Sequence, residues 1–428
     1  MIRSHRRLFA ALLALGLIAA ACDSNPQPET PATTAAATTV APATTVAPLS
    51  TAAPSTTAVP VAAVDRLLVV KEDGNVVTMR RDGSDVAPLT DDAAGVGYFQ
   101  PIWSPDATAV SVSRFDGSGF SLVRYDTDTG SSDEVPTEAN AFYVYWSPDG
   151  SQVGYLSTGG AGMGLSLANF DDDTAGGEIE LGQPFYFDWS PSGDQLVTLI
   201  GEQRFDVRDS TTGADPTEVA EPGAFQNPVW SAAGLFYVRT EAGVEQIVLG
   251  EPGGDVRVLA VAPAPVIMTA SATGDRLAVQ ATGNLDGVEA SFQAAPTLPL
   301  NRLAVLDVAT GAVIQVTNGP VAAYFWDPSG DKLLVLGQNF EERRLLWSVW
   351  SDGELTDLTE FLPSRVWADT YLPFFGQYAL STTMWSPDGT AFAFPGLIGE
   401  RGGIYVQEIS GGAPVFISDG NWVLWSPR

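Results

Sequence analysis

Apolar residues along this chain come in short stretches separated by polar turns, and one of these turns recurs. The stretch 142–146 is aromatic and β-branched, and Ser147-Pro148-Asp149-Gly150 follows it directly. Such a stretch predicts a strand, and Pro, Asp and Gly in this order favour a tight turn. Three more strands are expected before the pattern restarts: 152–156, 165–170 and a short strand that ends near 181. One unit is therefore predicted to be four short antiparallel strands.

The phrase Trp-Ser-Pro-Asp-Gly, complete or partly altered, ends one strand of every unit. Eight copies begin at Trp103, Trp146, Trp189, Trp230, Ala270, Trp326, Trp385 and Trp425. Successive copies lie 43, 43, 41, 40, 56, 59 and 40 residues apart. A four-stranded unit repeated every 40–45 residues or so is typical of a β-propeller blade. We therefore expect an all-β propeller in which each Trp ring packs between blades and its N–H finds a hydrogen-bond partner.

The two ends of the repeat region complement each other. Three strands are expected within 66–90 without a first strand before them, whereas 422–425 is a first strand with nothing after it. The last strand is therefore predicted to complete the first blade and close the ring. Counting first strands gives eight four-stranded blades. Seven is the alternative, because the units that begin at Trp230 and Ala270 have lost much of the phrase.

The phrase is followed by an apolar strand and, twice, by an Asp-x-x-Thr-Gly turn, at 126–130 and 307–311. This combination resembles the repeats of TolB-type propellers and of the propeller half of dipeptidyl-peptidase-type serine peptidases. The resemblance covers 65–428 and implies the propeller fold. Peptidase activity is not expected, because 65–428 has no His for a catalytic triad. TolB proteins bind partner proteins and carry an additional N-terminal domain, in whose place this chain has an Ala-, Thr- and Pro-rich stretch.

The first 64 residues predict export and anchoring. Three Arg residues precede an apolar run at 8–21 that is short for a membrane span, and Cys22 follows it. This resembles a bacterial lipoprotein signal, which implies lipid attachment to Cys22; ordinary secretion is the alternative. Residues 22–64 are mostly Ala, Thr, Pro and Val and predict a disordered tether. The expected organisation is a signal at 1–21, a lipidated tether at 22–64 and a propeller at 65–428, held at the outer side of the cell membrane.

Composition narrows the chemistry of the mature chain. The only His, His5, and the only Cys, Cys22, lie outside 65–428. This excludes a His or Cys nucleophile system, a zinc site of Cys and His, and disulfides within the propeller. The signal contains three of the 21 Lys and Arg residues and none of the 51 Asp and Glu residues, so the mature net charge is −33. Such an acidic chain is not expected to bind nucleic acid, and no cofactor or metal is expected.

The two long spacings predict insertions at 281–300 and 360–382. Both should lie on the face of the ring opposite the Trp-Ser-Pro-Asp-Gly turns, and long loops on a rigid scaffold commonly carry function. The second insertion is rich in aromatic residues with a few charges, a composition that suits contact with a protein, peptide or glycan. The candidate binding residues are Arg365, Trp367, Asp369, Tyr371, Phe374, Phe375 and Tyr378. The alternative is that these rings form a small satellite core at a blade junction.

These observations favour a monomeric, membrane-tethered extracytoplasmic propeller that binds a protein, peptide or glycan without catalysis. A carboxylate-based carbohydrate enzyme is the alternative, because paired acids need no His. That enzyme would require two carboxylates about 5–10 Å apart in the central funnel, one of them with a raised pKa. A purely structural envelope component is the third hypothesis.

Overall fold

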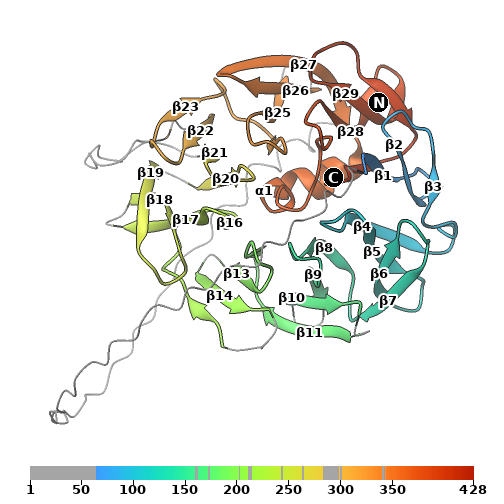
Figure 1. The fold of residues 1–428 in the computed structure, drawn as a ribbon, viewed down its shortest axis with the longest axis horizontal. Helices are drawn as coiled ribbons and strands as arrows, with labels where there is room; N and C mark the ends of the chain where they lie inside the picture. The colour runs from blue at the N-terminus through green and yellow to red at the C-terminus, as the bar shows by residue number, and fades with distance from the viewer. Residues whose placement is uncertain are drawn as a thin grey trace, which may run out of the picture. The chain divides into compact units, whose positions relative to one another are not determined.

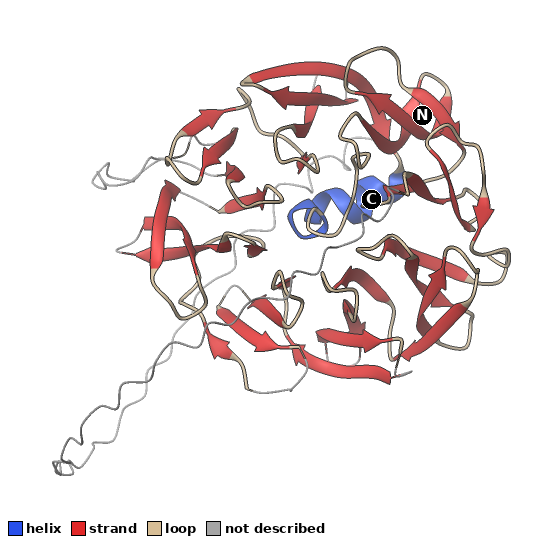
Figure 2. Cartoon of the chain, in the orientation of Figure 1, coloured by secondary structure: helices blue, strands red, loops and turns tan. Residues whose placement is uncertain are grey.

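The computed structural model shows a ring of small antiparallel sheets (Figure 1). It describes residues 64–428 apart from 160–161, 172–173, 202, 211–214, 242–243, 263–264, 283–297, 299–300, 340–341 and 343. Almost every regular element is a strand, and the few helical turns lie together at the centre of the ring (Figure 2). Eight blades are present, which confirms the expected propeller and its blade count.

The strands of the first four blades lie in chain order apart from the last strand of the chain, which belongs to blade 1. Blade 1 contains β31 (Trp422–Trp425), β1 (Arg66–Val70), β2 (Val76–Arg80) and β3 (Ala87–Pro88). Blade 2 contains β4 (Gly97–Trp103), β5 (Ala109–Phe115), β6 (Phe120–Asp126) and β7 (Ser132–Thr137). Blade 3 contains β8 (Ala141–Trp146), β9 (Val153–Gly159), β10 (Gly162–Asn169) and β11 (Thr174–Leu181). Blade 4 contains β12 (Phe185–Trp189), β13 (Gln195–Ile200), β14 (Arg204–Asp209) and β15 (Thr217–Glu218).

The other four blades follow the same plan. Blade 5 contains β16 (Val229–Ser231), β17 (Gly234–Glu241), β18 (Val244–Gly250) and β19 (Val256–Ala262). Blade 6 contains β20 (Val266–Ala270), β21 (Arg276–Ala281), β22 (Leu303–Asp307) and β23 (Val313–Gln315). Blade 7 contains β24 (Ala323–Trp326), β25 (Leu333–Asn339), β26 (Arg344–Ser351) and β27 (Glu354–Pro363). Blade 8 contains β28 (Ala391–Ile398), β29 (Arg401–Glu408) and β30 (Val415–Ser418).

The junction of blades 7 and 8 departs from the regular plan. The end of β27 pairs with β28 through Leu362 and Pro363, so these two blades form one seven-stranded sheet. The first strand of blade 8 is reduced to a single bridge between Trp385 and Phe392. The segment between Pro363 and Trp385 therefore leaves the sheet, and it supplies the helical turns at the centre of the ring.

The ring is closed by pairing between the two ends of the repeat region, as the sequence predicts. β31 lies antiparallel to β1, with Leu67 opposite Trp425 and Val70 opposite Trp422. The Trp425 Nε1 donates to the Asp65 carboxylate at 2.8 Å. Arg81 binds the same carboxylate at 3.0 Å and that of Asp388 in blade 8, also at 3.0 Å. Closure therefore combines strand pairing with a small polar network.

In blades 2 to 8, the Trp-Ser-Pro-Asp-Gly phrase or its altered copy builds the turn that leads into the second strand of the blade. In blade 3 the Ser147 hydroxyl donates to Asp149 at 2.6 Å and accepts the N–H of Gln152 at 3.0 Å. Gly150 has φ of 75°, which glycine adopts without strain. Burial opposes ionisation of Asp149, but hydrogen bonds from Ser147 and Ser151 outweigh burial and lower the pKa of that carboxyl. The phrase is therefore a self-contained turn.

The repeated Trp residues connect neighbouring blades. The Nε1 of Trp189 donates to the carbonyl of Tyr145 in the preceding blade at 3.2 Å. Trp326 and Trp385 make the equivalent bonds, to Thr269 at 3.0 Å and to Phe325 at 3.0 Å. The expected structural role is confirmed for these three rings.

No helix among the described residues is long and apolar enough to cross a membrane.

Candidate functional site

The second insertion enters the central channel of the ring instead of covering its surface. We call residues 364–384 the plug segment. It forms a π-helical turn, η1 (Trp367–Tyr371), a 3-10 turn, η2 (Leu372–Phe374), and the short helix α1 (Phe375–Tyr378). Figure 1 shows α1 at the centre of the ring of blades. The rings of this segment therefore meet several blades at once.

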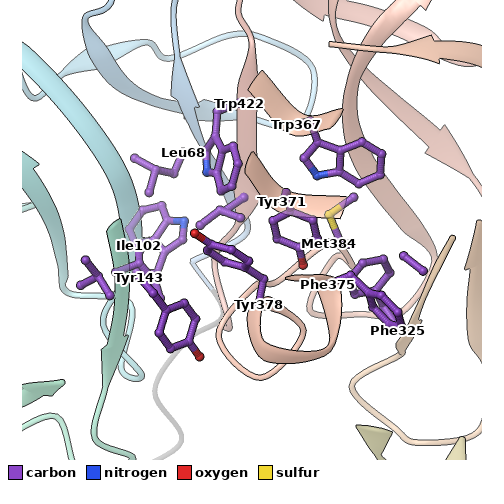
Figure 3. Packing of buried hydrophobic residues seen from close by; sticks show 14 of the residues in the cluster. Leu68, Ile102, Tyr143, Phe325, Trp367, Tyr371, Phe375, Tyr378, Met384 and Trp422 are labelled. Carbon is purple, nitrogen blue, oxygen red and sulfur yellow. The ribbon is translucent and has the colours of Figure 1, made fainter. Parts of the chain in front are cut away.

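Four of the seven predicted binding residues are aromatic side chains buried in the channel. Trp367, Tyr371, Phe375 and Tyr378 are 2%, 0%, 3% and 5% exposed. Their rings point outward to the surrounding blades in Figure 3. Trp367 packs on Trp347 and Phe375 packs on Tyr324, both in blade 7. Tyr371 packs on Trp422 of blade 1, and Tyr378 packs on Tyr143 of blade 3. The ring centroids of these pairs lie 4.9–5.8 Å apart. These four rings are core side chains, as the alternative interpretation expected, but they join the main hydrophobic core instead of forming a small satellite core at a blade junction. Their burial leaves them no surface for a partner.

The other three predicted residues lie at the surface. Arg365 and Asp369 form an exposed ion pair at 3.1 Å, one helical turn apart. Phe374 is 51% exposed. The prediction that this face binds a partner therefore rests on these three residues. The predictions for the other insertion and for lipidation of Cys22 stay predictions, because 283–297, 299–300 and Cys22 lie outside the described residues.

A polar residue that the sequence analysis missed holds the plug segment in place. The Gln377 side chain donates to the Phe187 carbonyl at 2.8 Å and accepts the Phe187 N–H at 3.1 Å. The Tyr143 hydroxyl donates to the Gln377 carbonyl at 3.0 Å, and the Tyr378 hydroxyl donates to the Phe142 carbonyl at 2.7 Å. A lone Gln among aromatic residues gives no sequence signal for this role, because its partners lie about 190 and 234 residues away.

The plug segment leaves part of the channel open on the face that carries the Trp-Ser-Pro-Asp-Gly turns. We call this face the motif face and the opening, about 450 Å³ in volume, the axial cavity. Its walls come from the ends of the first strands and the following turns of all eight blades, and residues 379–384 of the plug segment line it as well. Four Pro residues of the repeated turns lie at its lining: Pro105, Pro328, Pro387 and Pro427. The cavity is therefore a blind cup on the propeller axis.

The lining of the axial cavity is aromatic and uncharged over most of its extent. Tyr145, Trp230 and Trp326 are partly exposed there, and hydroxyl-bearing side chains such as Ser231 and Thr382 lie among them. The lining contains no Lys or Arg. Its ionisable acids are Asp188 and Asp327, each 2% exposed.

Asp188 replaces the apolar residue that most copies carry just before the repeated Trp. Its two carboxylate oxygens accept the backbone N–H groups of Trp189 at 2.8 Å and of Trp230, in the next blade, at 2.6 Å. Burial raises the pKa of Asp188 to about 7, and hydrogen bonds from the two N–H groups and from the Tyr145 side chain only partly offset burial. The carboxyl therefore connects blades 4 and 5 at the cavity wall.

Asp327 stands where most copies of the phrase have Ser, and it acts in that place as a turn acceptor. It accepts the Ser329 hydroxyl at 2.6 Å and the Lys332 N–H at 2.7 Å. The Lys332 ammonium lies 3.3 Å from the same carboxylate. Both acids at the axial cavity are thus engaged by the protein itself.

Three buried polar atoms on cavity-lining residues have no hydrogen-bond partner within the described residues. They are the Nε1 of Trp103, the Nε1 of Trp146 and the hydroxyl of Thr269. Trp103 and Trp146 occupy the same position as the three Trp residues that do bond to the preceding blade. All three atoms have almost no accessible surface, so they belong to the packed wall behind the cavity.

A second, polar cavity of about 380 Å³ lies beside the repeated turns of blades 2 and 3. Four carboxylates line it: Asp106, Asp126, Asp133 and Asp149. Three of them accept hydrogen bonds from their own turns, and Asp133 pairs with Arg124 at 2.7 Å. Within the described residues, no group of three or more His, Cys, Asp or Glu side chains is arranged to hold a metal ion.

Comparison with known proteins identifies the architecture and goes no further. No family model and no curated protein matches the chain. The structure of the eukaryotic initiation factor is similar, with a TM-score of 0.55, 12% identity and coverage of 85% of this chain and 99% of that one. TolB from Acinetobacter baumannii (TM-score 0.39, 14% identity, 69% of this chain) is also similar, and this chain spans 64% of it. The β-propeller domain of the Trilobed protease from Pyrococcus furiosus gives a TM-score of 0.48 at 13% identity, over 77% and 99% of the two chains. The chain is an eight-bladed β-propeller.

Proposed function

We propose that the protein is an exported, lipid-anchored propeller that acts as a non-catalytic binding module for a protein, peptide or glycan. Its binding site is the axial cavity on the motif face. One observation carries this proposal: all eight blades converge on a blind cup of about 450 Å³ with partly exposed aromatic walls. A concave, largely apolar site with a few polar groups is the usual form of a ligand site.

Binding is favoured over catalysis because both cavity acids already serve the fold. Asp188 accepts two backbone N–H groups, and Asp327 accepts three donors of its own turn. The raised pKa of Asp188 is the one observation in favour of a carboxylate-based carbohydrate enzyme. Hydrolysis of chromogenic glycosides by the wild type, with loss in Asp188→Asn, would establish that alternative. We expect no turnover.

The location of the site can be tested by photo-crosslinking in intact cells. The crosslinking amino acid p-benzoylphenylalanine replaces Ser381 in the axial cavity or, in the matched control, the exposed Phe374 of the same plug segment. We expect covalent adducts from position 381 and none from position 374, as read by mass spectrometry. Adducts from position 374 alone would move the site to the exposed residues of the plug segment, Arg365, Asp369 and Phe374. Adducts from neither position would argue against a binding module.

Anchoring is tested separately from binding. Wild-type protein and the Cys22→Ser variant are labelled in cells with an alkyne fatty acid and fractionated. Because Cys22 is the only Cys, we expect label and membrane association in the wild type and neither in the variant. Equal membrane association of both proteins would contradict the lipid anchor.

A further inference from the structure

We propose that the axial cavity binds an uncharged carbohydrate, a short stretch of a neutral oligosaccharide. This inference rests on the proposed function and specifies its ligand class. Three features of the lining support it: the absence of Lys and Arg, the partly exposed aromatic rings, and the half-buried hydroxyl side chains.

The charge of the lining selects against ionic ligands of both signs. An anionic sugar such as a uronate would find no Lys or Arg in the lining, within a chain of net charge −30. A cation would find only Asp188 and Asp327, whose oxygens already accept hydrogen bonds from the protein. Burying an unpaired charge is costly, so a neutral ligand fits this lining best.

The apolar surface of the cavity consists largely of flat rings. Tyr145, Trp230 and Trp326 come from blades 3, 5 and 7, and each is partly exposed. A sugar ring has an apolar C–H face that packs on an aromatic ring, while its hydroxyls stay at the edge. Rings at three positions around the axis therefore offer several surfaces on which a sugar can stack.

Hydroxyl side chains of the lining complement the hydroxyl groups of a sugar. Ser231, Ser381 and Thr382 line the cavity and are half-buried. A side-chain hydroxyl can donate and accept a hydrogen bond, and a sugar hydroxyl can do the same. The polar part of the lining therefore suits a ligand that carries several hydroxyls.

Neutral and charged oligosaccharides of equal length provide the direct test. The full mature protein is titrated with maltotriose, cellotriose and mannotriose, and with trigalacturonate and the glucosamine trimer as charged controls. Trp fluorescence reports binding, because Trp230 and Trp326 line the cavity. A neutral glycan array extends the search to other linkages. We expect at least one neutral oligosaccharide to bind and the two charged trimers not to bind.

Two small substitutions test the site without removing a packed ring. Ser231→Ala and Ser381→Ala each remove one hydroxyl from the half-buried part of the lining and keep the rest of the side chain. Because no packed ring is changed, we expect each to lower the free energy of unfolding by less than ~1 kcal/mol. We expect each to weaken the neutral oligosaccharide about 3- to 10-fold, the effect of one lost hydrogen bond. Trp230→Ala should weaken it further, and Phe374→Ala should have no effect.

Several outcomes would overturn the inference. These are tighter binding of a charged trimer, binding of no neutral oligosaccharide on the array, or neutral binding that both small substitutions leave unchanged. If crosslinking at position 381 captures a peptide instead, the proposed function stands and the carbohydrate assignment fails. If position 381 captures nothing and no glycan binds, both fail.

Discussion

At the scale of single residues, Gln377 provides hydrogen bonds that no strand supplies. Its amide binds both backbone groups of Phe187 in the channel, and its side chain is 4% exposed. Gln377→Leu leaves a buried N–H and C=O unpaired, so we expect the free energy of unfolding to fall by roughly 2–5 kcal/mol. Urea titration followed by Trp fluorescence measures this. Arg365→Ala, on the same segment but fully at the surface, should change stability by less than ~0.5 kcal/mol. Equal effects would contradict the role of Gln377.

Asp188 gives a second prediction at this scale, a pH dependence of stability. Its pKa is raised from 3.8 to about 7 in the folded chain, so the folded state holds this proton more tightly than the unfolded state. The resulting stabilisation is complete below about pH 4 and is lost as the pH rises to about 7. At ~1.4 kcal/mol per pH unit the loss reaches at most ~4 kcal/mol.

Asp188→Asn removes this titration and keeps the size of the side chain. We expect the variant to be less stable than the wild type at pH 5, because an amide cannot accept both N–H groups. The difference should shrink at pH 8, where the wild type has lost the proton. Urea unfolding of both proteins at the two pH values measures it. Parallel pH dependence would show that Asp188 does not titrate in this window.

At the scale of elements, the repeated turn depends on its Ser side chain, whose hydroxyl accepts a backbone N–H that no carbonyl accepts. Ser147 is fully buried, and its hydroxyl accepts the Gln152 N–H at 3.0 Å. Ser147→Ala leaves that N–H without an acceptor, so we expect a loss of about 1–3 kcal/mol. Ser151 bonds to the same Asp149 from an exposed position. Ser151→Ala should therefore cost clearly less in the same denaturation experiment, and a larger cost there would contradict this description of the turn.

At the scale of the whole molecule, the ring depends on one strand at its C-terminal end. Deleting 422–428 removes β31, exposes the apolar edge of β1, and removes the contact of Trp422 with Tyr371 of the plug segment. We expect loss of the cooperative unfolding transition and association of the truncated chain, because an open apolar strand edge invites pairing. Size-exclusion chromatography and urea titration test this.

A circular permutant is the matched control. It joins residue 428 to residue 64 and opens the chain in the exposed turn at 253–254. The two joined residues already hydrogen-bond, since the Val64 N–H donates to the Arg428 carbonyl at 2.8 Å. The permutant should remain monomeric and unfold cooperatively. A truncated chain as stable as the permutant would contradict the role of closure.

The fold could be predicted from the sequence because its signals are local. Trp146 and the turn after it define a strand end within five residues, and their recurrence defines the blade. The units at Trp230 and Ala270 still form four strands although the phrase is altered, because β16 and β20 keep their apolar residues. The position of the candidate site could not be predicted in the same way. A run of rings such as Trp367, Tyr371 and Tyr378 has the same composition whether it covers a surface or fills a channel.

The sequence by itself determined the four-stranded blade and the closure of the ring, because strand periodicity and turn chemistry act over a few residues and repeat along the chain. It left eight and seven blades as alternatives, and the structure has eight. Only the tertiary structure decided where the plug segment lies and where a cavity remains. Gln377 meets Phe187 across the channel, and the axial cavity gathers side chains from all eight blades. Such contacts depend on how the blades are arranged around the axis, and no local pattern records that arrangement.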